Sequence, residues 1–171
     1  MTKTINRRKF IIGSGAAGIA ANTTKPTLAD IPKINKGSIK PIVIASDNGY
    51  TMKNGGDRNC VETAFNMITK GEDVLDALIE GVNIVELDPL DASVGVGGRP
   101  NANGVIQLDS CCMHGPKKQA GGVGALEGVS TPSLVAKAVM QHTDHHLLVG
   151  QGAQDFARNM GFEITLEVKL Y

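Results

Sequence analysis

The chain has 171 residues, of which 42% are hydrophobic and 20% charged, so it is long enough and apolar enough to form one globular domain. Its formal net charge is zero, which argues against nucleic acid or an anionic membrane surface as a partner. Tryptophan is absent and glycine is abundant at 21 residues, so we expect an aliphatic core with close backbone packing.

Residues 1–29 have the features of a twin-arginine export signal. Arg7 and Arg8 precede a weakly apolar, small-residue segment, 11–21, that is too short to span a bilayer as a helix. Residues 27–29 offer a small-residue cleavage site. We therefore expect a periplasmic or secreted protein whose only encounter with a membrane is export.

The same segment contains Gly13, Gly15 and Gly18, which match the spacing of the dinucleotide-binding fingerprint. That fingerprint requires a preceding strand and a full helix after it, whereas here the chain reaches Pro26 almost at once. The export signal is therefore the favoured interpretation. Residues 30–40, with a proline, a glycine and several lysines, indicate a linker.

A buried strand is predicted at 41–46 and a turn at 47–49, because a short apolar run is followed by Asp-Asn-Gly. Apolar residues at helical spacing predict one helix over 58–70 and a second that Asp73 caps and that ends before Pro89. Three glutamates on these helices are interpreted as solvated positions: Glu62, Glu80 and Glu86.

The glycine-rich stretch 88–124 organises the rest of the chain. Gly95, Gly97 and Gly98 predict a tight loop, because glycine allows positive φ and close backbone approach. Residues 105–113 follow as a strand with turn signals at both ends.

Three further elements are expected after this stretch. Thr131 and Pro132 predict the start of a helix, with threonine as its cap and proline at its first position. Residues 145–149 indicate a strand, a turn is expected at 150–152, and a short helix over 153–160 stops at Gly161. The tail 163–171 alternates as a strand would.

Cys60, Cys111 and Cys112 are an odd number without metal-ligand spacing, so buried free thiols are expected. Two other interpretations are a catalytic cysteine and a metal site. Cys111 or Cys112 with His114 is a local nucleophile and base candidate, but adjacent strand residues point to opposite faces. A cluster of His142, Asp144, His145 and His146 resembles a metal site, but its two adjacent histidines would face opposite ways, so no metal is expected.

Several spaced motifs over about 41–162 resemble one known family. Ser-Val-Gly-x-Gly-Gly-x-Pro from Ser93, Leu-Asp-x-x-x-Met-x-Gly from Leu108, and the Gly-Gly-Val-Gly that follows are similar to the first half of glycosylasparaginases and plant-type asparaginases. The resemblance implies an α+β fold that forms part of an αββα N-terminal-nucleophile hydrolase sandwich. It implies no cofactor, and it assigns 41–162 to the α-subunit and 163–171 to a divergent tail.

In this family a threonine freed by autocleavage is the nucleophile, and its own α-amino group is the base. None of the threonines of this chain has the context of that nucleophile, so we expect it in a complementary β-subunit, with a homodimer or heterotetramer as the assembly. The resemblance implies hydrolysis of the side-chain amide of asparagine or N-glycosylated asparagine by the intact enzyme. The chain alone is expected to be inactive.

The resemblance also implies which residues shape the substrate pocket and its loops: Asp47, Ser93, Gly95, Gly97, Gly98 and Asp109. Asp47 stands where glycosylasparaginases carry a pocket tryptophan. This difference favours the alternative activity of an isoaspartyl peptidase or L-asparaginase of the same family. A non-catalytic fragment that requires a complementary chain is the other alternative.

Overall fold

The computed structural model describes residues 40–165. The expected export signal, the linker up to residue 39 and residues 166–171 of the tail lie outside the described residues. In chain order the elements are α2 (Asp47–Thr51), α3 (Cys60–Thr69), α4 (Val74–Glu86), the 3₁₀ helix η1 (Gly95–Gly97), β1 (Leu108–His114), β2 (Gln119–Leu126), α5 (Pro132–His142), β3 (Leu148–Val149) and α6 (Gly150–Asn159). Within residues 40–165, no helix has the length and apolar character needed to cross a membrane.

The three strands form one small mixed sheet in the order β1-β2-β3. β1 and β2 are antiparallel and pair from Leu108 opposite Leu126 to His114 opposite Gln119, with an irregularity after Leu108. β3 runs parallel to β2. The described part is therefore α+β, and β1 confirms the strand predicted near 105–113.

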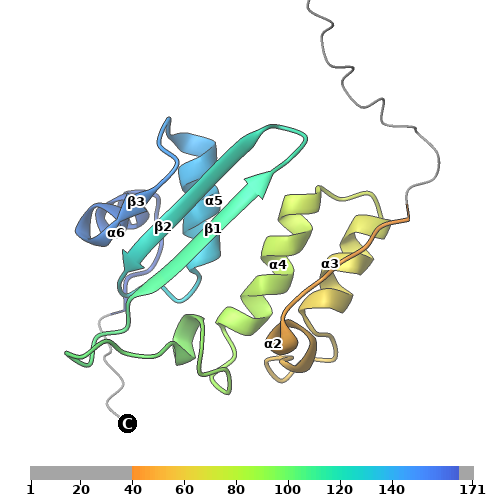
Figure 1. Cartoon of the computed structure of the whole chain (residues 1–171), viewed down its shortest axis with the longest axis horizontal. Helices are drawn as coiled ribbons and strands as arrows, with labels where there is room; N and C mark the ends of the chain where they lie inside the picture. Colours follow the sequence, from red (N-terminus) through yellow and green to blue (C-terminus); the bar gives the residue numbers. More distant parts are fainter. Residues whose placement is uncertain (1–39, 166–171) are drawn as a thin grey trace, which may run out of the picture. The chain divides into compact units, whose positions relative to one another are not determined.

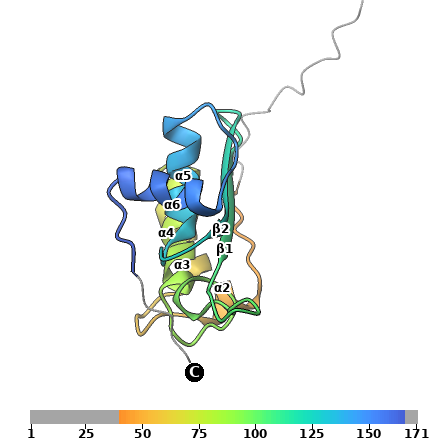
Figure 2. The same cartoon turned by 90° about the vertical axis from the view of Figure 1, so that its left-hand side faces the viewer.

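Helices cover one face of this sheet. Helix α5 packs on β1 and β2, and α6 packs on β2. Figure 2 shows the helices on one side of the strands, and Figure 1 shows α4 continuing the helical layer past β1. The core between α5, α6 and the sheet is aliphatic, as expected, and its buried residues are Val123, Leu126, Val129, Val135, Ala136, Val139, Ala153 and Ala157.

The other face of the sheet is open in the described residues. Cys112 packs toward the helices, so its neighbours Cys111 and Met113 point the opposite way. Met113 is 74% exposed, and Leu147 and Val149, on either side of the helix-facing Leu148, are 60% and 58% exposed. We call the surface formed by Asp109, Cys111, Met113, Leu147 and Val149 the open sheet face.

The glycine run of β2 allows α5 to approach the sheet closely. A Cβ atom on Gly121 would lie 2.4 Å from the Ala136 carbonyl oxygen and 2.6 Å from the Met140 nitrogen, both in the α5 backbone. The sequence analysis assigned no strand here, since glycine is a poor strand former. Tertiary packing overrides that preference.

The two predicted helices before the glycine-rich loop are confirmed, as is the Asp73 cap, while the cap of the first helix was not predicted. Asn59 and Glu62 form a capping box at the start of α3, and the Asp73 carboxylate accepts the Leu75 N–H at 2.9 Å at the start of α4. Helix α4 ends at Glu86, before Asp88 and Pro89, as predicted.

Glu62 and Glu80 are exposed as predicted, but the prediction of a solvated Glu86 is wrong. Glu86 is only 3% exposed, and its carboxylate accepts hydrogen bonds from the Ser133 N–H at 3.1 Å and the Ser133 hydroxyl at 2.7 Å. Because the Thr131 side chain makes no cap hydrogen bond, the carboxylate from α4 caps α5 in its place. Burial raises the pKa of Glu86, and the bonds from Ser133 oppose this effect only in part.

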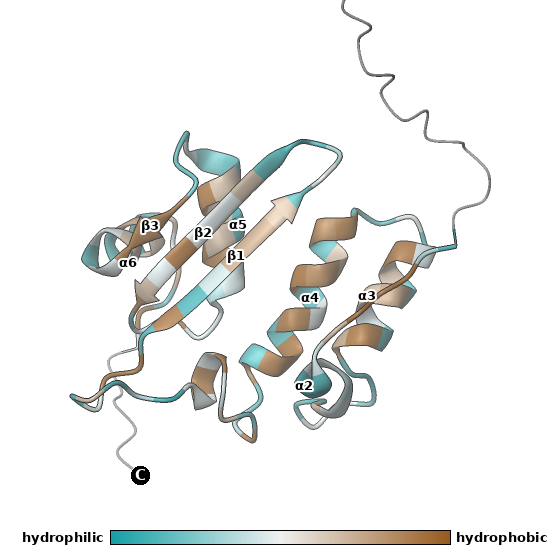
Figure 3. Ribbon diagram, in the orientation of Figure 1, coloured by the Kyte–Doolittle hydropathy of each residue, from teal (hydrophilic) through white to brown (hydrophobic). Residues whose placement is uncertain are grey.

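The prediction of a buried strand at 41–46 is also wrong. These residues pair with no strand in the described part of the chain, and Ile42 and Ile44 are 79% and 88% exposed. Figure 3 shows this apolar segment running along the helical layer of α3 and α4. Val43 is half-buried, so the segment buries one side, but it lacks the neighbouring strand that a sheet requires.

The turns predicted at 47–49 and 150–152 are helical, and two of the three cysteines are not fully buried. Residues 47–49 begin helix α2, and 150–152 are the first turn of α6, which stops before Gly161 as predicted. Cys60 is buried, whereas Cys112 is half-buried and Cys111 is exposed on the open sheet face. Residues 163–165 of the tail form no strand.

Candidate functional site

Two buried carboxylates hold the loop between α4 and β1. Asp88 accepts the Asn54 N–H at 2.7 Å and the Leu90 N–H at 3.0 Å, and Asp91 organises the part that carries Ser93. Asp91 is 4% exposed and accepts hydrogen bonds from the Ser93 N–H at 2.7 Å, the Ser93 hydroxyl at 2.6 Å and the Val94 N–H at 3.0 Å. Burial alone raises the pKa of Asp91, but the hydrogen bonds from Ser93, Val94 and Asn48 outweigh it and lower the pKa below its ordinary value. Asp91 is therefore an ionised anchor of the loop.

The glycines of the loop make this arrangement possible. Gly95 has φ +55°, and a Cβ atom there would lie 1.8 Å from the Glu86 carbonyl oxygen. A Cβ atom on Gly97 would lie 1.7 Å from the Asp91 carbonyl oxygen, and one on Gly98 would lie 2.7 Å from Leu108. Backbone atoms exclude a side chain at Gly95 and Gly97, whereas at Gly98 the closest contact is with the Leu108 side chain, so the first two glycines are the ones that the shape of the loop requires.

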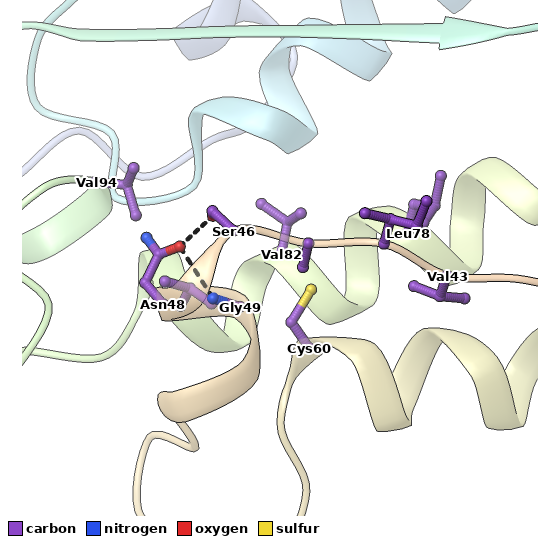
Figure 4. A pocket seen from close by; sticks show the side chains of 11 residues that line it. Val43, Ser46, Asn48, Gly49, Cys60, Leu78, Val82 and Val94 are labelled. Atoms are coloured by element: carbon purple, nitrogen blue, oxygen red, sulfur yellow. Dashed lines mark hydrogen bonds between the residues drawn. The ribbon is translucent and has the colours of Figure 1, made fainter.

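Asn48 joins the loop to the start of the described chain, and the sequence analysis missed it. Its side-chain N–H groups donate to Asp91 Oδ2 at 3.1 Å and to Ser93 Oγ at 3.3 Å. Its side-chain oxygen accepts the Gly49 N–H at 2.9 Å and the Ser46 hydroxyl (Figure 4). Interpreting 47–49 as a turn concealed this role, although an asparagine in such a position is the one signal that could have indicated it.

Ser93 and Asp47 lie on either side of Asn48 in this arrangement. Ser93 contacts Asn48 directly, and Asp47 precedes Asn48 in the first turn of α2 with its side chain exposed. The structure thus gathers polar groups of Ser46, Asn48 and Ser93 around Asp91. These groups can hold a polar ligand, but none is a base beside a nucleophile.

A pocket of about 250 Å³ opens next to this polar cluster. Ser46 and Asn48 line one end, and the remainder is apolar, with Val43, Leu78, Val82 and the thiol of Cys60 (Figure 4). Burial raises the pKa of Cys60, which keeps the thiol protonated and a poor nucleophile.

Asp109 is not part of the Asp91 cluster and lies on β1. Its carboxylate accepts the Ala125 N–H at 2.8 Å, next to the irregular pairing that follows Leu108. Ala125 has φ +47°, so Asp109 stabilises an unusual backbone conformation of β2.

The cysteine and histidine alternative finds no support in the geometry. His114 is 5% exposed and both ring nitrogens are engaged, one with Asp73 and one with the Lys117 N–H. Cys112 faces the helices and burial raises its pKa, while Cys111 points to the open sheet face. No thiol is therefore activated by His114.

The histidines near the end of α5 do not gather around one point. His142, His145 and His146 are all exposed, and residues 40–165 contain no group of three or more potential metal ligands.

Comparisons with known proteins give one consistent result. The family model described as asparaginase matches residues 37–170. The N(4)-(beta-N-acetylglucosaminyl)-L-asparaginase of Elizabethkingia miricola is 40% identical over 161 residues, which cover 92% of this chain and 45% of that protein. The mouse protein of the same name is 35% identical, covering 77% of this chain and 36% of its own length.

A plant-type L-asparaginase of Pyrococcus furiosus is 41% identical over 107 residues, covering 63% of this chain and 34% of that protein. The chain therefore spans less than half the length of the curated relatives it matches. The matched part contains every residue of the Asp91 cluster.

Proposed function

This chain belongs to the asparaginase family, and on that premise we propose that it is the first half of an amidohydrolase that cleaves the side-chain amide of asparagine or N-glycosylated asparagine. The observation that carries the proposal is the family match over residues 37–170, which includes the whole Asp91 cluster. The threonine nucleophile belongs to the second half, so this half alone is expected to be inactive.

In the proposed reaction the second half supplies the threonine, whose α-amino group takes the hydroxyl proton as the oxygen attacks the amide carbon. The amine then leaves, and water hydrolyses the ester. The role of this chain is positional: Asp91 fixes the loop, and the polar groups of Asn48 and Ser93 lie where a substrate could be bound. Asp109 shapes the adjoining strand pair.

The open sheet face supports the need for a complementary half. Met113, Leu147 and Val149 are apolar and more than half exposed, and β1 has no strand on its outer side in the described residues. Contiguous apolar surface and unpaired strand edges are expected at an interface rather than at a solvent boundary. We propose that the second half completes an αββα sandwich here, within a homodimer or heterotetramer.

Asp47 bears on the choice of substrate. An exposed carboxylate replaces the tryptophan of glycosylasparaginases, so the site loses an aromatic surface for a sugar and gains a negative charge. Isoaspartyl dipeptides and free asparagine are therefore the alternative substrates. Export by the twin-arginine route, with cleavage near Asp30, is part of the same proposal.

The test begins with the DNA beyond the codon for Tyr171, read in all three frames for a second half with a threonine nucleophile. The two halves are then expressed together and assayed on GlcNAc-asparagine, asparagine and isoaspartyl dipeptides, with the 171-residue chain alone as control. We expect hydrolysis of at least one substrate by the pair and none by the chain alone. The absence of an encoded second half, or a folded pair inactive on all three, would refute the enzymatic proposal and leave a non-catalytic fragment.

A further inference from the structure

A buried histidine joins the end of β1 to the start of α4, on the side of the molecule away from the Asp91 loop (Figure 1). His114 Nε2 lies 2.8 Å from Asp73 Oδ2, the carboxylate whose other oxygen caps α4. The hydrogen bond from His114 is the main reason that the pKa of Asp73 is lowered to about 2. Asp73 is therefore ionised at any pH well above 2 and accepts a hydrogen bond from the Nε2–H group.

The second ring nitrogen has a different partner. His114 Nδ1 accepts the backbone N–H of Lys117 at 3.1 Å, inside the turn that connects β1 to β2. The turn also depends on a bond from the Lys118 N–H to the Gly115 carbonyl at 3.1 Å and on φ +53° at Lys118. With Nε2 donating and Nδ1 accepting, the geometry requires the neutral Nε2–H tautomer.

A proton added to Nδ1 cannot be accommodated in this arrangement. It would place an N–H group opposite the Lys117 N–H, so the hydrogen bond to the turn must break. The bond to Asp73 meanwhile becomes a charge-assisted pair, because imidazolium and carboxylate have opposite charges. Protonation thus strengthens one contact of His114 and removes the other.

The charged groups that face His114 and Asp73 come from the β1–β2 turn, α4 and α5. The Lys117 ammonium lies 3.8 Å from Asp73, and on α5 Lys137 is paired with Asp76 of α4 at 2.6 Å. The 5% exposure of His114 means that solvent cannot replace the lost partner without movement of the turn.

We propose that His114 is an acid-sensitive latch: the neutral ring closes the β1–β2 turn onto α4, and the imidazolium releases the turn while it remains bound to Asp73. The latch holds the hairpin of the open sheet face, so acid loosens one end of that face and leaves the Asp91 loop unaffected. This device is independent of the amidohydrolase function.

The test is a pH titration of the full chain by NMR with ¹⁵N-labelled histidine, combined with amide hydrogen exchange. At the highest pH of the titration, His114 should show a protonated Nε2 and an unprotonated Nδ1. As its imidazolium forms, the protection factor of the Lys117 amide, corrected for intrinsic exchange, should fall roughly fivefold, the effect of one net hydrogen bond.

Asp73→Asn is the matched variant, because asparagine caps helices as well as aspartate does but carries no charge. Without the carboxylate the imidazolium loses its partner, so the loss of Lys117 protection should move to lower pH. The proposal is overturned if His114 carries its proton on Nδ1, or if Lys117 protection stays constant while the imidazolium forms. Release at the same pH in the variant would also contradict it.

Discussion

The close contact of α5 with the glycine run of β2 predicts a large cost for a single methyl group. In Gly121→Ala the new Cβ atom would lie 2.4 Å from the Ala136 carbonyl oxygen, whereas ordinary contact begins at 3.4 Å. The helix must therefore move by about 1 Å, because the clash is with backbone atoms that cannot rotate away. Overpacking of a core costs about 1 to 3 kcal/mol, and a clash with backbone atoms places this substitution at the upper end, about 3 kcal/mol.

The assay is urea denaturation followed by circular dichroism. With a slope of about 2 kcal/mol per molar urea, a loss of about 3 kcal/mol lowers the midpoint by about 1.5 M. Gly152→Ala is the matched control, since nothing lies within 4 Å of its Cβ position in α6, and it should stabilise the chain by about 0.5 kcal/mol. A Gly121→Ala midpoint equal to that of the wild type would refute the packing argument.

Three further results are expected. Glu86→Ala should cost about 3 kcal/mol, because it leaves the buried Ser133 N–H unpaired and the Ser133 hydroxyl with only a long 3.5 Å contact to Asn83 Oδ1, whereas Glu86→Gln keeps an acceptor in place. Since burial raises the pKa of Glu86, urea midpoints should show the wild type losing stability relative to the Gln variant as pH rises above about 4.5. The pKa of Asp73 is lowered to about 2 from 3.8, so its contribution to stability is complete above about pH 4 and is lost as pH falls toward 2. Between these two pH values, the urea midpoint of the wild type should therefore fall more than that of Asp73→Asn. Iodoacetamide should label the exposed Cys111 well before Cys60, which is buried and whose pKa burial raises, and equal labelling rates followed by mass spectrometry would contradict the fold.

Local signals predicted most of the helices and two strands, near 105–113 and at the end of 145–149. Helices α4 and α5 begin where Asp73 and Pro132 indicate, because caps and proline act within one turn of the residue that carries them. Helix α3 was indicated by the helical spacing of its apolar residues. The tight loop at Gly95 and Gly97 was predicted for the same reason. These features depend on the backbone next to them and on no distant contact.

The errors and omissions that matter most for the site involve partners that are distant in sequence. Glu86 has the sequence context of a surface glutamate. In the structure it is buried, where its carboxylate accepts the N–H of Ser133, 47 residues later in the sequence. Gln119–Leu126 contains three glycines and forms a strand because α5 lies against Gly121. Asn48 gains its role from Asp91, 43 residues away, which a sequence window cannot reach.

The segment 41–46 also depends on a distant partner, but here the partner strand is absent from the described residues. Its alternation buries Val43 and exposes Ile42 and Ile44, as in a strand with one face on a core, yet no strand among residues 40–165 pairs with it. The apolar pattern of the open sheet face has the same character: Met113, Leu147 and Val149 satisfy a strand pattern but contact no second layer. A partner that covers the exposed apolar side chains of segment 41–46 and of the open sheet face would stabilise the complex. The gain is roughly 25 cal/mol for each Å² of apolar surface buried. Both surfaces therefore favour association with the second half that the proposed function requires, and they would promote aggregation if the chain were made alone.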